Sequence, residues 1–156
     1  MKWLLDTNVI CEPGRRRPNT KVVAWLDSLN EHECALSAIT LGEIEKGIHA
    51  LPGGPARRAH EKALAVLRHR FTGRILSVDE PVAAKWGELM GEAERVGRPL
   101  PAVDNLLGAT AVVYGLTLVT RNTADISPGV RVFNPFNRDH YYRQGEVDTT
   151  FPPRAQ

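Results

Sequence analysis

The sequence has few cysteines, no long apolar run and little net charge, and each scarcity excludes a class of protein. Its only cysteines, Cys11 and Cys34, have neither the Cys-x-x-Cys nor the Cys/His spacing of a zinc site. They form no disulfide framework, which favours a reducing compartment, and we expect the cytoplasm. No apolar stretch approaches the ~18–20 residues that span a membrane. The N-terminal apolar run is too short and too polar for a signal peptide.

The charge balance alone does not indicate a nucleic-acid binder. Lys and Arg number 20 against 18 Asp and Glu, giving a formal net charge of +2. The arginines nevertheless cluster, at residues 15–17 and again at Arg57, Arg58, Arg68, Arg70 and Arg74. Arginine suits bidentate contact with phosphate, but a solvated helix face or loop explains such clusters equally well.

The hydrophobic pattern predicts one α/β domain. The chain has 156 residues, of which 42% are apolar, enough for a single compact core. Short apolar strands alternate with segments of helical periodicity, which predicts a parallel sheet covered by helices on both faces. We place the domain at residues 1–136 and a polar C-terminal tail at 137–156. The expected strands are 2–6, 34–37, 75–78, 116–120 and 130–133, and the expected helices are 20–29, 40–50, 60–71, 79–97 and 103–114.

Acidic residues fall repeatedly where a predicted strand ends or a helix begins. Asp6 ends the first strand, Glu43 lies one turn into the helix after the second, and Asp104 opens the helix before the fourth. Asn122 and Asp125 follow the fourth strand directly. Ligands of open parallel sheets bind at the carboxyl ends of the strands, so these residues are expected to meet at one edge.

Such a group of carboxylates predicts a cation. Like charges oppose joint ionisation, and a divalent cation removes that cost. Ligation by oxygen alone favours Mg²⁺, with Mn²⁺ as a possible substitute.

Each acid also has a purely structural interpretation. Asp6 fits an Asx turn at a strand end. Thr40 and Glu43 match a capping box, in which the glutamate only satisfies the helix N-terminus. Asp104 fits an N-cap or a favourable interaction with the helix dipole. Asn122 and Asp125 fit an ordinary turn after a strand.

Four segments of the chain carry a resemblance to a known family: LLDTNVICE at residues 4–12, LSAITLGEIEKGI at 36–48, PLPAVDNLLGATAVVYGLTLVTRN at 99–122 and TADISPGVRVFNP at 123–135. Together they resemble PIN-domain nucleases, and most closely the VapC/FitB-type toxins of type II toxin–antitoxin pairs. Each motif is short, but their order, spacing and strand–helix setting are together specific. The tail after Pro135 has no part in the resemblance.

The resemblance implies a three-layer sandwich with about five parallel strands in the order 3-2-1-4-5. It implies a Mg²⁺ or Mn²⁺ site formed by Asp6, Glu43 and Asp104. The fourth acidic position of the family falls at or beside Asn122 or Asp125, and the sequence leaves open which of them supplies it. Three further residues match supporting polar positions of the family: Thr7, Asn8 and Thr120. This sequence departs from many relatives in the segment from Asn105 to Gly108, and a glycine inside a helix costs roughly 1 kcal/mol relative to alanine.

From the resemblance we expect a metal-dependent endoribonuclease. Water activated at the metal would cleave RNA phosphodiesters and leave 5′-phosphate and 3′-hydroxyl ends. Asp125 is a further candidate catalytic residue. The resemblance also implies a homodimer and a cognate antitoxin that binds operator DNA. Candidates for contact with the RNA backbone are Arg15, Arg16, Arg17 and Arg121, together with Arg68 and Arg70 on the basic helix.

Two alternatives remain at this point. A haloacid-dehalogenase-like phosphatase also starts with an aspartate at the end of its first strand, but it needs a second aspartate where this chain has Asn8. A catalytically degenerate PIN module would act only as a binding or regulatory protein, and the asparagine at position 122 keeps that alternative open.

Overall fold

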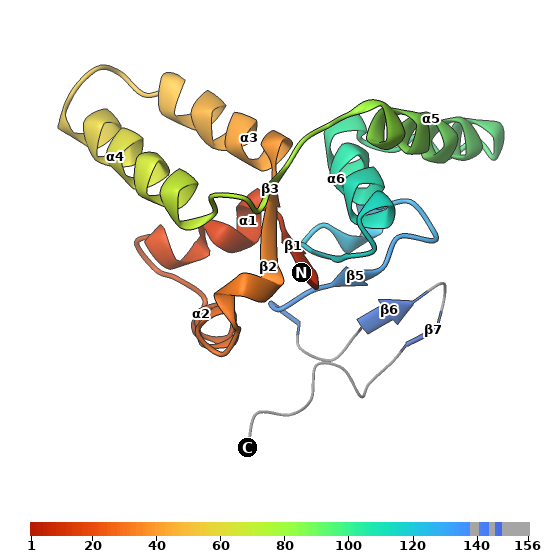
Figure 1. Ribbon diagram of the computed structural model, residues 1–156, viewed down its shortest axis with the longest axis horizontal. Helices are drawn as coiled ribbons and strands as arrows, with labels where there is room; N and C mark the ends of the chain where they lie inside the picture. The colour runs from red at the N-terminus through yellow and green to blue at the C-terminus, as the bar shows by residue number, and fades with distance from the viewer. Residues whose placement is uncertain (138–140, 144–145, 148–156) are drawn as a thin grey trace.

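The fold is built on a sheet of short, apolar strands. The structure is a computed structural model and describes residues 1–137, 141–143 and 146–147. Its five parallel strands lie in the order β3-β2-β1-β4-β5 (Figure 1), which confirms the predicted order. They are β1 (Trp3–Leu5), β2 (Cys34–Ser37), β3 (Ile75–Leu76), β4 (Thr117–Val119) and β5 (Val132–Phe133).

Two further strands extend the sheet beyond β5. β6 (Tyr141–Arg143) pairs antiparallel with β5, and β7 (Glu146–Val147) pairs antiparallel with β6. Both fall in the predicted tail 137–156, where we expected no strand. The other residues of that tail beyond Asn137 lie outside the described part of the chain.

Helices cover both faces of the sheet. Figure 1 shows two helical hairpins, α3 with α4 and α5 with α6, rising on opposite sides of the strands, while α1 and α2 lie on the side of α3 and α4. The helices are α1 (Thr7–Ile10), α2 (Thr20–Asp27), α3 (Ala38–His49), α4 (Pro55–Arg70), α5 (Glu80–Arg95) and α6 (Ala102–Val113). Three single-turn 3₁₀ helices join them: η1 (Glu12–Gly14), η2 (Glu31–Glu33) and η3 (Thr123–Asp125).

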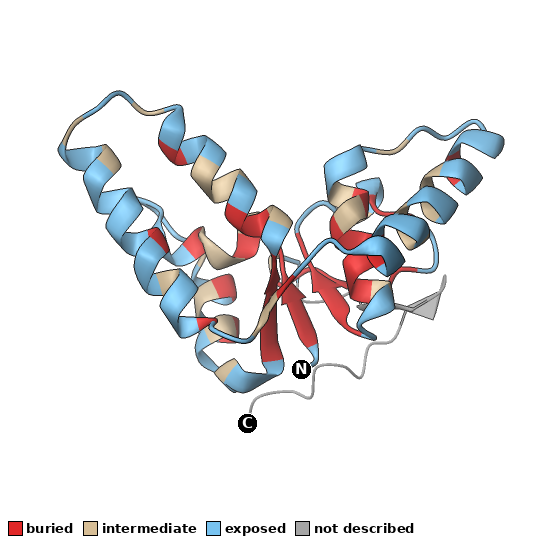
Figure 2. Ribbon diagram, turned by 45° about the horizontal axis from the view of Figure 1, so that its top comes forward, coloured by how far each residue is buried: buried red, intermediate tan, exposed pale blue. Residues whose placement is uncertain are grey.

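Alternation along the strands divides the core into two layers. Trp3 and Leu5 of β1 pack with α1–α4, whereas Leu4 between them packs with α6 on the other face. Successive side chains of a strand point to opposite faces, so a sheet buried on both sides needs apolar residues at every position. Figure 2 shows this pattern as continuous burial along the strands.

Several helix boundaries differ from the prediction. The four-residue helix α1 was not predicted, and α4 begins at Pro55 rather than near residue 60. Proline suits the first helical position because its missing N–H has no partner there. Helix α5 begins at Glu80, close to the predicted start at residue 79, and Asp79 is its N-cap, since its side chain accepts a hydrogen bond from the Val82 backbone N–H.

The structure also explains the glycine inside α6. A Cβ atom built at Gly108 would lie 3.3 Å from a methyl group of Val130 and 3.7 Å from one of Ile126. The glycine therefore lets α6 pack closely against the segment that leads into β5, which offsets its weak helix propensity.

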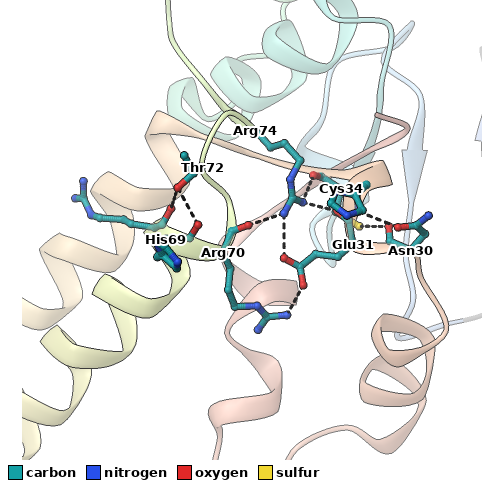
Figure 3. A network of polar contacts seen from close by, with 9 residues as sticks. Asn30, Glu31, Cys34, His69, Arg70, Thr72 and Arg74 are labelled. Atoms are coloured by element: carbon teal, nitrogen blue, oxygen red, sulfur yellow. Dashed lines mark hydrogen bonds and ion pairs between the residues drawn. The ribbon is translucent and has the colours of Figure 1, made fainter.

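A network around Arg74 closes the amino-terminal edge of the sheet (Figure 3). The Arg74 guanidinium donates to the backbone carbonyls of Glu31, Cys34 and Arg70, and to the Glu31 carboxylate at 2.9 Å. It also lies 4.6 Å from the centre of the Phe71 ring. Arg70 donates to the same carboxylate at 2.9 Å. Arg70 is thereby held at the edge opposite the acids, which argues against the predicted RNA contact for this residue.

This network predicts a pH-dependent contribution to stability. The hydrogen bond from Arg70 lowers the pKa of Glu31, burial partly opposes it, and Arg74 lowers it further. The unfolded chain therefore binds the proton more readily than the folded chain, so the contribution is present above the ordinary glutamate pKa and is lost as pH falls. We expect Glu31→Gln to lower the free energy of unfolding at pH 7 but to match the wild type near pH 3, measured by urea denaturation at each pH. An equal difference at both pH values would contradict this.

Candidate active site

Asp6 lies at the carboxyl end of β1 and is held by three hydrogen bonds. Its Oδ1 atom accepts from the Thr7 backbone N–H at 2.6 Å, which caps α1. Its Oδ2 atom accepts from the Asn8 amide and the Thr120 hydroxyl, each at 2.6 Å. Asp6 is thus the N-cap of α1 through one oxygen, a role that the Asx-turn interpretation did not specify, while the other oxygen accepts from two side chains. The supporting positions expected at Thr7, Asn8 and Thr120 all contact Asp6.

The environment of Asp6 favours its neutral form. Burial raises the pKa of Asp6, and the nearby charge of Glu43 raises it as well, while the hydrogen bonds from Thr120, Thr7 and Asn8 lower it. Such a carboxyl group stays ionised more readily if a positive charge lies beside it.

Glu43 points toward Asp6 and has no capping role. Helix α3 begins two residues earlier than predicted, and its cap is Ser37, whose hydroxyl accepts from a backbone N–H. Thr40 is fully buried within the helix and its hydroxyl donates to the backbone of β1 at 3.4 Å. The capping-box interpretation is therefore wrong. Instead, Glu43 Oε2 accepts a hydrogen bond from the Thr7 hydroxyl.

Asp104 reaches the same edge from the first turn of α6. The N-cap of that helix is Pro101, so the N-cap interpretation of Asp104 is wrong. Burial raises the pKa of Asp104, and the charges of Asp6 and Asp125 raise it further, while a hydrogen bond from the Asn122 side chain lowers it. The charges of Asp6 and Asp125 therefore both act on Asp104. Asn122 is anchored in turn, since its backbone N–H donates to the Thr120 hydroxyl at 3.0 Å.

Within the described residues, the four carboxylates of this cluster have no basic partner. In the described part of the chain, no Lys, Arg or His forms an ion pair with Asp6, Glu43, Asp104 or Asp125. Among the same residues, no three Asp, Glu, His or Cys side chains are close enough to hold a metal ion by themselves. The acids thus share one edge and one electrostatic environment without forming a closed cage.

The donor chemistry of this edge fits a hard cation. The acids offer carboxylate oxygens, and the Thr7 hydroxyl, the Asn8 amide N–H and the Thr120 hydroxyl donate to them and so fix their orientation, as hydrogen-bond partners of metal ligands do. Mg²⁺ usually keeps several waters and takes only one or two carboxylates directly, so it does not need a closed protein cage. One or two of Asp6, Glu43 and Asp104 could therefore hold Mg²⁺ or Mn²⁺ directly, with water between the ion and the other carboxylates.

Arg121 follows this cluster directly in the chain. Its guanidinium lies 3.9 Å from the centre of the Phe136 ring and 3.5 Å from Glu12. Arg15 forms an ion pair with the same glutamate at 3.0 Å. Arg16 and Arg17 are exposed in the following loop.

Sequence reasoning missed two buried polar residues beside the site. Glu12 lies outside every strand and helix predicted above, yet it is only 3% exposed. Asn105 is fully buried and fixes the loop after β4, because its amide donates to the Asp125 carbonyl and its oxygen accepts from the Ser127 N–H, each at 2.9 Å. A polar residue at the start of an otherwise apolar helix was the available signal for Asn105. An acid inside the segment LLDTNVICE was the signal for Glu12.

Comparison with known proteins identifies relatives over most of the chain. The family described as PIN domain matches residues 3–126. The Toxin FitB of Neisseria gonorrhoeae is 43% identical, over 86% of this chain and 98% of its own length. The VapC ribonuclease Y4jK of Sinorhizobium fredii is 33% identical, over 85% of this chain and 96% of its own. A solved structure of FitAB bound to an IR36 DNA fragment superposes with a TM-score of 0.78 at 41% identity, covering 86% of this chain and 95% of that one.

Proposed function

Because the chain belongs to the PIN-domain family, among relatives named as FitB and VapC toxins, we propose that it is a metal-dependent endoribonuclease and the toxin of a toxin–antitoxin pair. The observation that carries this proposal is the group of carboxylates at the carboxyl ends of the strands, which have no basic partner among the described residues. Within it, burial and the charge of Glu43 raise the pKa of Asp6, and burial and the charges of Asp6 and Asp125 raise the pKa of Asp104. The residue two positions after Asp6 is Asn8, and α1 contains no aspartate, so the phosphatase alternative has no support.

In this proposal Asp6, Glu43 and Asp104 hold Mg²⁺, or Mn²⁺ in its place. The bound ion would polarise the scissile phosphate and lower the pKa of the attacking water. Thr120 and Asn8 fix Asp6, while Thr7 fixes Glu43 through Oε2 and leaves Oε1 to accept a proton from water. Asn122 orients Asp104 as a hydrogen-bond donor, and Asp125 adds negative charge beside it. This division of roles is our proposal for the fourth position.

The relatives also suggest partners. FitAB was solved in complex with DNA, so we propose that this chain binds a cognate antitoxin and, through it, operator DNA. A homodimer is proposed on the family resemblance. No helix in the described residues is long and apolar enough to cross a membrane. The proposed site of action is the cytoplasm, where RNA is available.

Metal removal tests the proposed activity. We expect the purified chain to cleave single-stranded RNA in Mg²⁺, to stop in chelator and to resume when Mg²⁺ or Mn²⁺ is restored, with 5′-phosphate ends on the products. The measurement is gel analysis of end-labelled RNA, with Asp104→Asn purified in parallel to exclude a contaminating ribonuclease. Undiminished cleavage in chelator would rule out the metal mechanism. Absence of cleavage under all conditions would favour the degenerate binding module.

A further inference from the structure

Glu12 is a buried carboxylate that the proposed chemistry does not use. It is the first residue of η1, four residues after Asn8 in the chain, and its side chain is 4% exposed. Oε1 accepts a hydrogen bond from the Asn19 backbone N–H at 2.8 Å. Oε2 is buried without a well-directed hydrogen bond from any described residue, although two guanidinium groups lie close to it. Burying a charge in this way is costly unless paired groups compensate.

The two guanidinium groups belong to Arg15 and Arg121. Arg15 Nε lies 3.0 Å and Arg121 Nη2 lies 3.5 Å from Glu12 Oε2. Their side chains are 51% and 45% exposed, so each arginine has one end fixed by a buried anion and the rest accessible to solvent. A guanidinium has five N–H donors, and most of them remain available to a second anion.

The structure fixes Arg121 next to the acids. Its backbone N–H donates to Asn8 Oδ1 at 3.1 Å, while the amide of Asn8 donates to Asp6. Its guanidinium lies on the Phe136 ring, 3.9 Å from the ring centre. Contacts with an aromatic face and a carboxylate together restrict a side chain that would otherwise sample many rotamers. These contacts hold the Arg121 side chain in one orientation beside the carboxylates.

Arg15 lies at the same end of the molecule. Burial raises the pKa of the Cys11 thiol, the charge of Arg15 lowers it, and the charges of Asp6 and Glu43 raise it, so Arg15 and the two acids act on the same side chain. Positive charge at this position matters, because four carboxylates that have no basic partner among the described residues repel a polyanion.

We propose that Glu12 is a positioning residue that presents Arg121 and Arg15 to the RNA phosphates flanking the cleaved bond. This inference rests on the proposed ribonuclease function and adds to it the groups that bind the substrate backbone. Glu12 itself touches no substrate. It acts by holding the two guanidinium groups where phosphates on either side of the scissile bond can reach them.

The decisive variant is Glu12→Gln, because the change in net charge and the loss of arginine positioning have opposite effects on RNA affinity. Glutamine keeps the length of the side chain and the acceptor for the Asn19 N–H, but it removes one negative charge. Simple electrostatics then predicts tighter RNA binding, since the net positive charge increases. If Glu12 positions the arginines, binding becomes weaker, KM rises several-fold and kcat changes little. We expect the second result.

A second variant keeps the test independent of whether Glu12→Gln folds. Arg121→Ala changes an exposed side chain, and we expect it to reduce the slope of log K against log salt by about 0.7, as for one lost phosphate contact on single-stranded RNA. Arg131→Ala is the matched control. It removes the same charge, but Arg131 lies at the amino-terminal ends of β4 and β5, away from the acids, and donates to the Gly115 carbonyl. We expect its slope to equal that of the wild type.

The measurement is fluorescence anisotropy of a labelled single-stranded RNA in chelator at several salt concentrations, with circular dichroism as a check of folding. Steady-state cleavage in Mg²⁺ supplies KM and kcat. Suppose that the wild type cleaves RNA. The positioning role is then overturned if Glu12→Gln binds RNA as tightly as the wild type, or if Arg121→Ala has the same salt dependence as Arg131→Ala. Either result would leave the ribonuclease function intact. A wild type that neither binds nor cleaves RNA would overturn both.

Discussion

We expect Asp6→Asn to lower the rate of RNA cleavage by more than about 100-fold, since loss of even an outer-shell partner of a metal typically costs about 10–100-fold in affinity or activity. Asp6 is coupled to two other acids of the cluster, since the charge of Glu43 raises the pKa of Asp6 and the charge of Asp6 raises the pKa of Asp104. Asparagine removes that charge. It also turns one acceptor into a donor, whereas Oδ2 of Asp6 accepts from two donors, Asn8 and Thr120. The measurement is the initial rate of cleavage in saturating Mg²⁺.

Two controls separate this effect from misfolding. Asp27→Asn makes the same chemical change at an exposed position at the end of α2, and we expect it to cleave RNA at the wild-type rate. Isothermal titration with Mn²⁺ should show weaker binding to the Asp6→Asn protein, while its circular dichroism spectrum stays unchanged. Cleavage by a folded Asp6→Asn protein at more than a tenth of the wild-type rate would show that Asp6 is not essential.

The parallel sheet could be predicted because both of its faces are buried. Each of the five strands is a short apolar run bounded by polar residues, and this pattern is local in the sequence. Helix α1 was missed because its four residues are too few to show a 3.6-residue period. The antiparallel strand β6 was missed because its position is set by pairing with the β5 edge, and no pattern within the polar tail indicates such a pairing.

The site could be predicted where it depends on topology and not where it depends on side-chain contacts. Asp6 and Asp104 follow from the rule that strand ends meet at one edge. For Glu43, the sequence predicted a helix from residue 40, where a capping role for Glu43 is possible. The helix begins at Ala38 instead, and Thr40 is buried against β1, so that role is excluded. Glu12 and Asn105 were missed because their partners lie far along the chain, at Arg121 and Ser127. The sequence signals named above for Glu12 and Asn105 mark each residue as unusual, but they do not indicate which distant residue it contacts.

The largest expected effect on stability belongs to Trp25→Ala. Trp25 is 4% exposed and lies with its ring centre 5.5 Å from that of Trp3, edge to face, and 5.0 Å from that of Phe133. This cluster joins α2 to β1 and β5, so its loss affects both the helix layer and the sheet. Truncating a buried tryptophan to alanine typically costs about 3–5 kcal/mol. We expect a decrease of that size in the free energy of unfolding, measured by urea denaturation.

Trp25→Phe distinguishes packing from polarity at the same position. The indole Nε1 of Trp25 is buried and has no hydrogen-bond partner among the described residues. An unpaired buried donor costs about 1–3 kcal/mol, and phenylalanine removes that cost while keeping an aromatic face toward Trp3 and Phe133. We therefore expect Trp25→Phe to retain most of the stability that Trp25→Ala loses. If both variants were destabilised equally, the N–H group would have to be satisfied in solution, for example by an ordered water, and the indole itself would be the stabilising element.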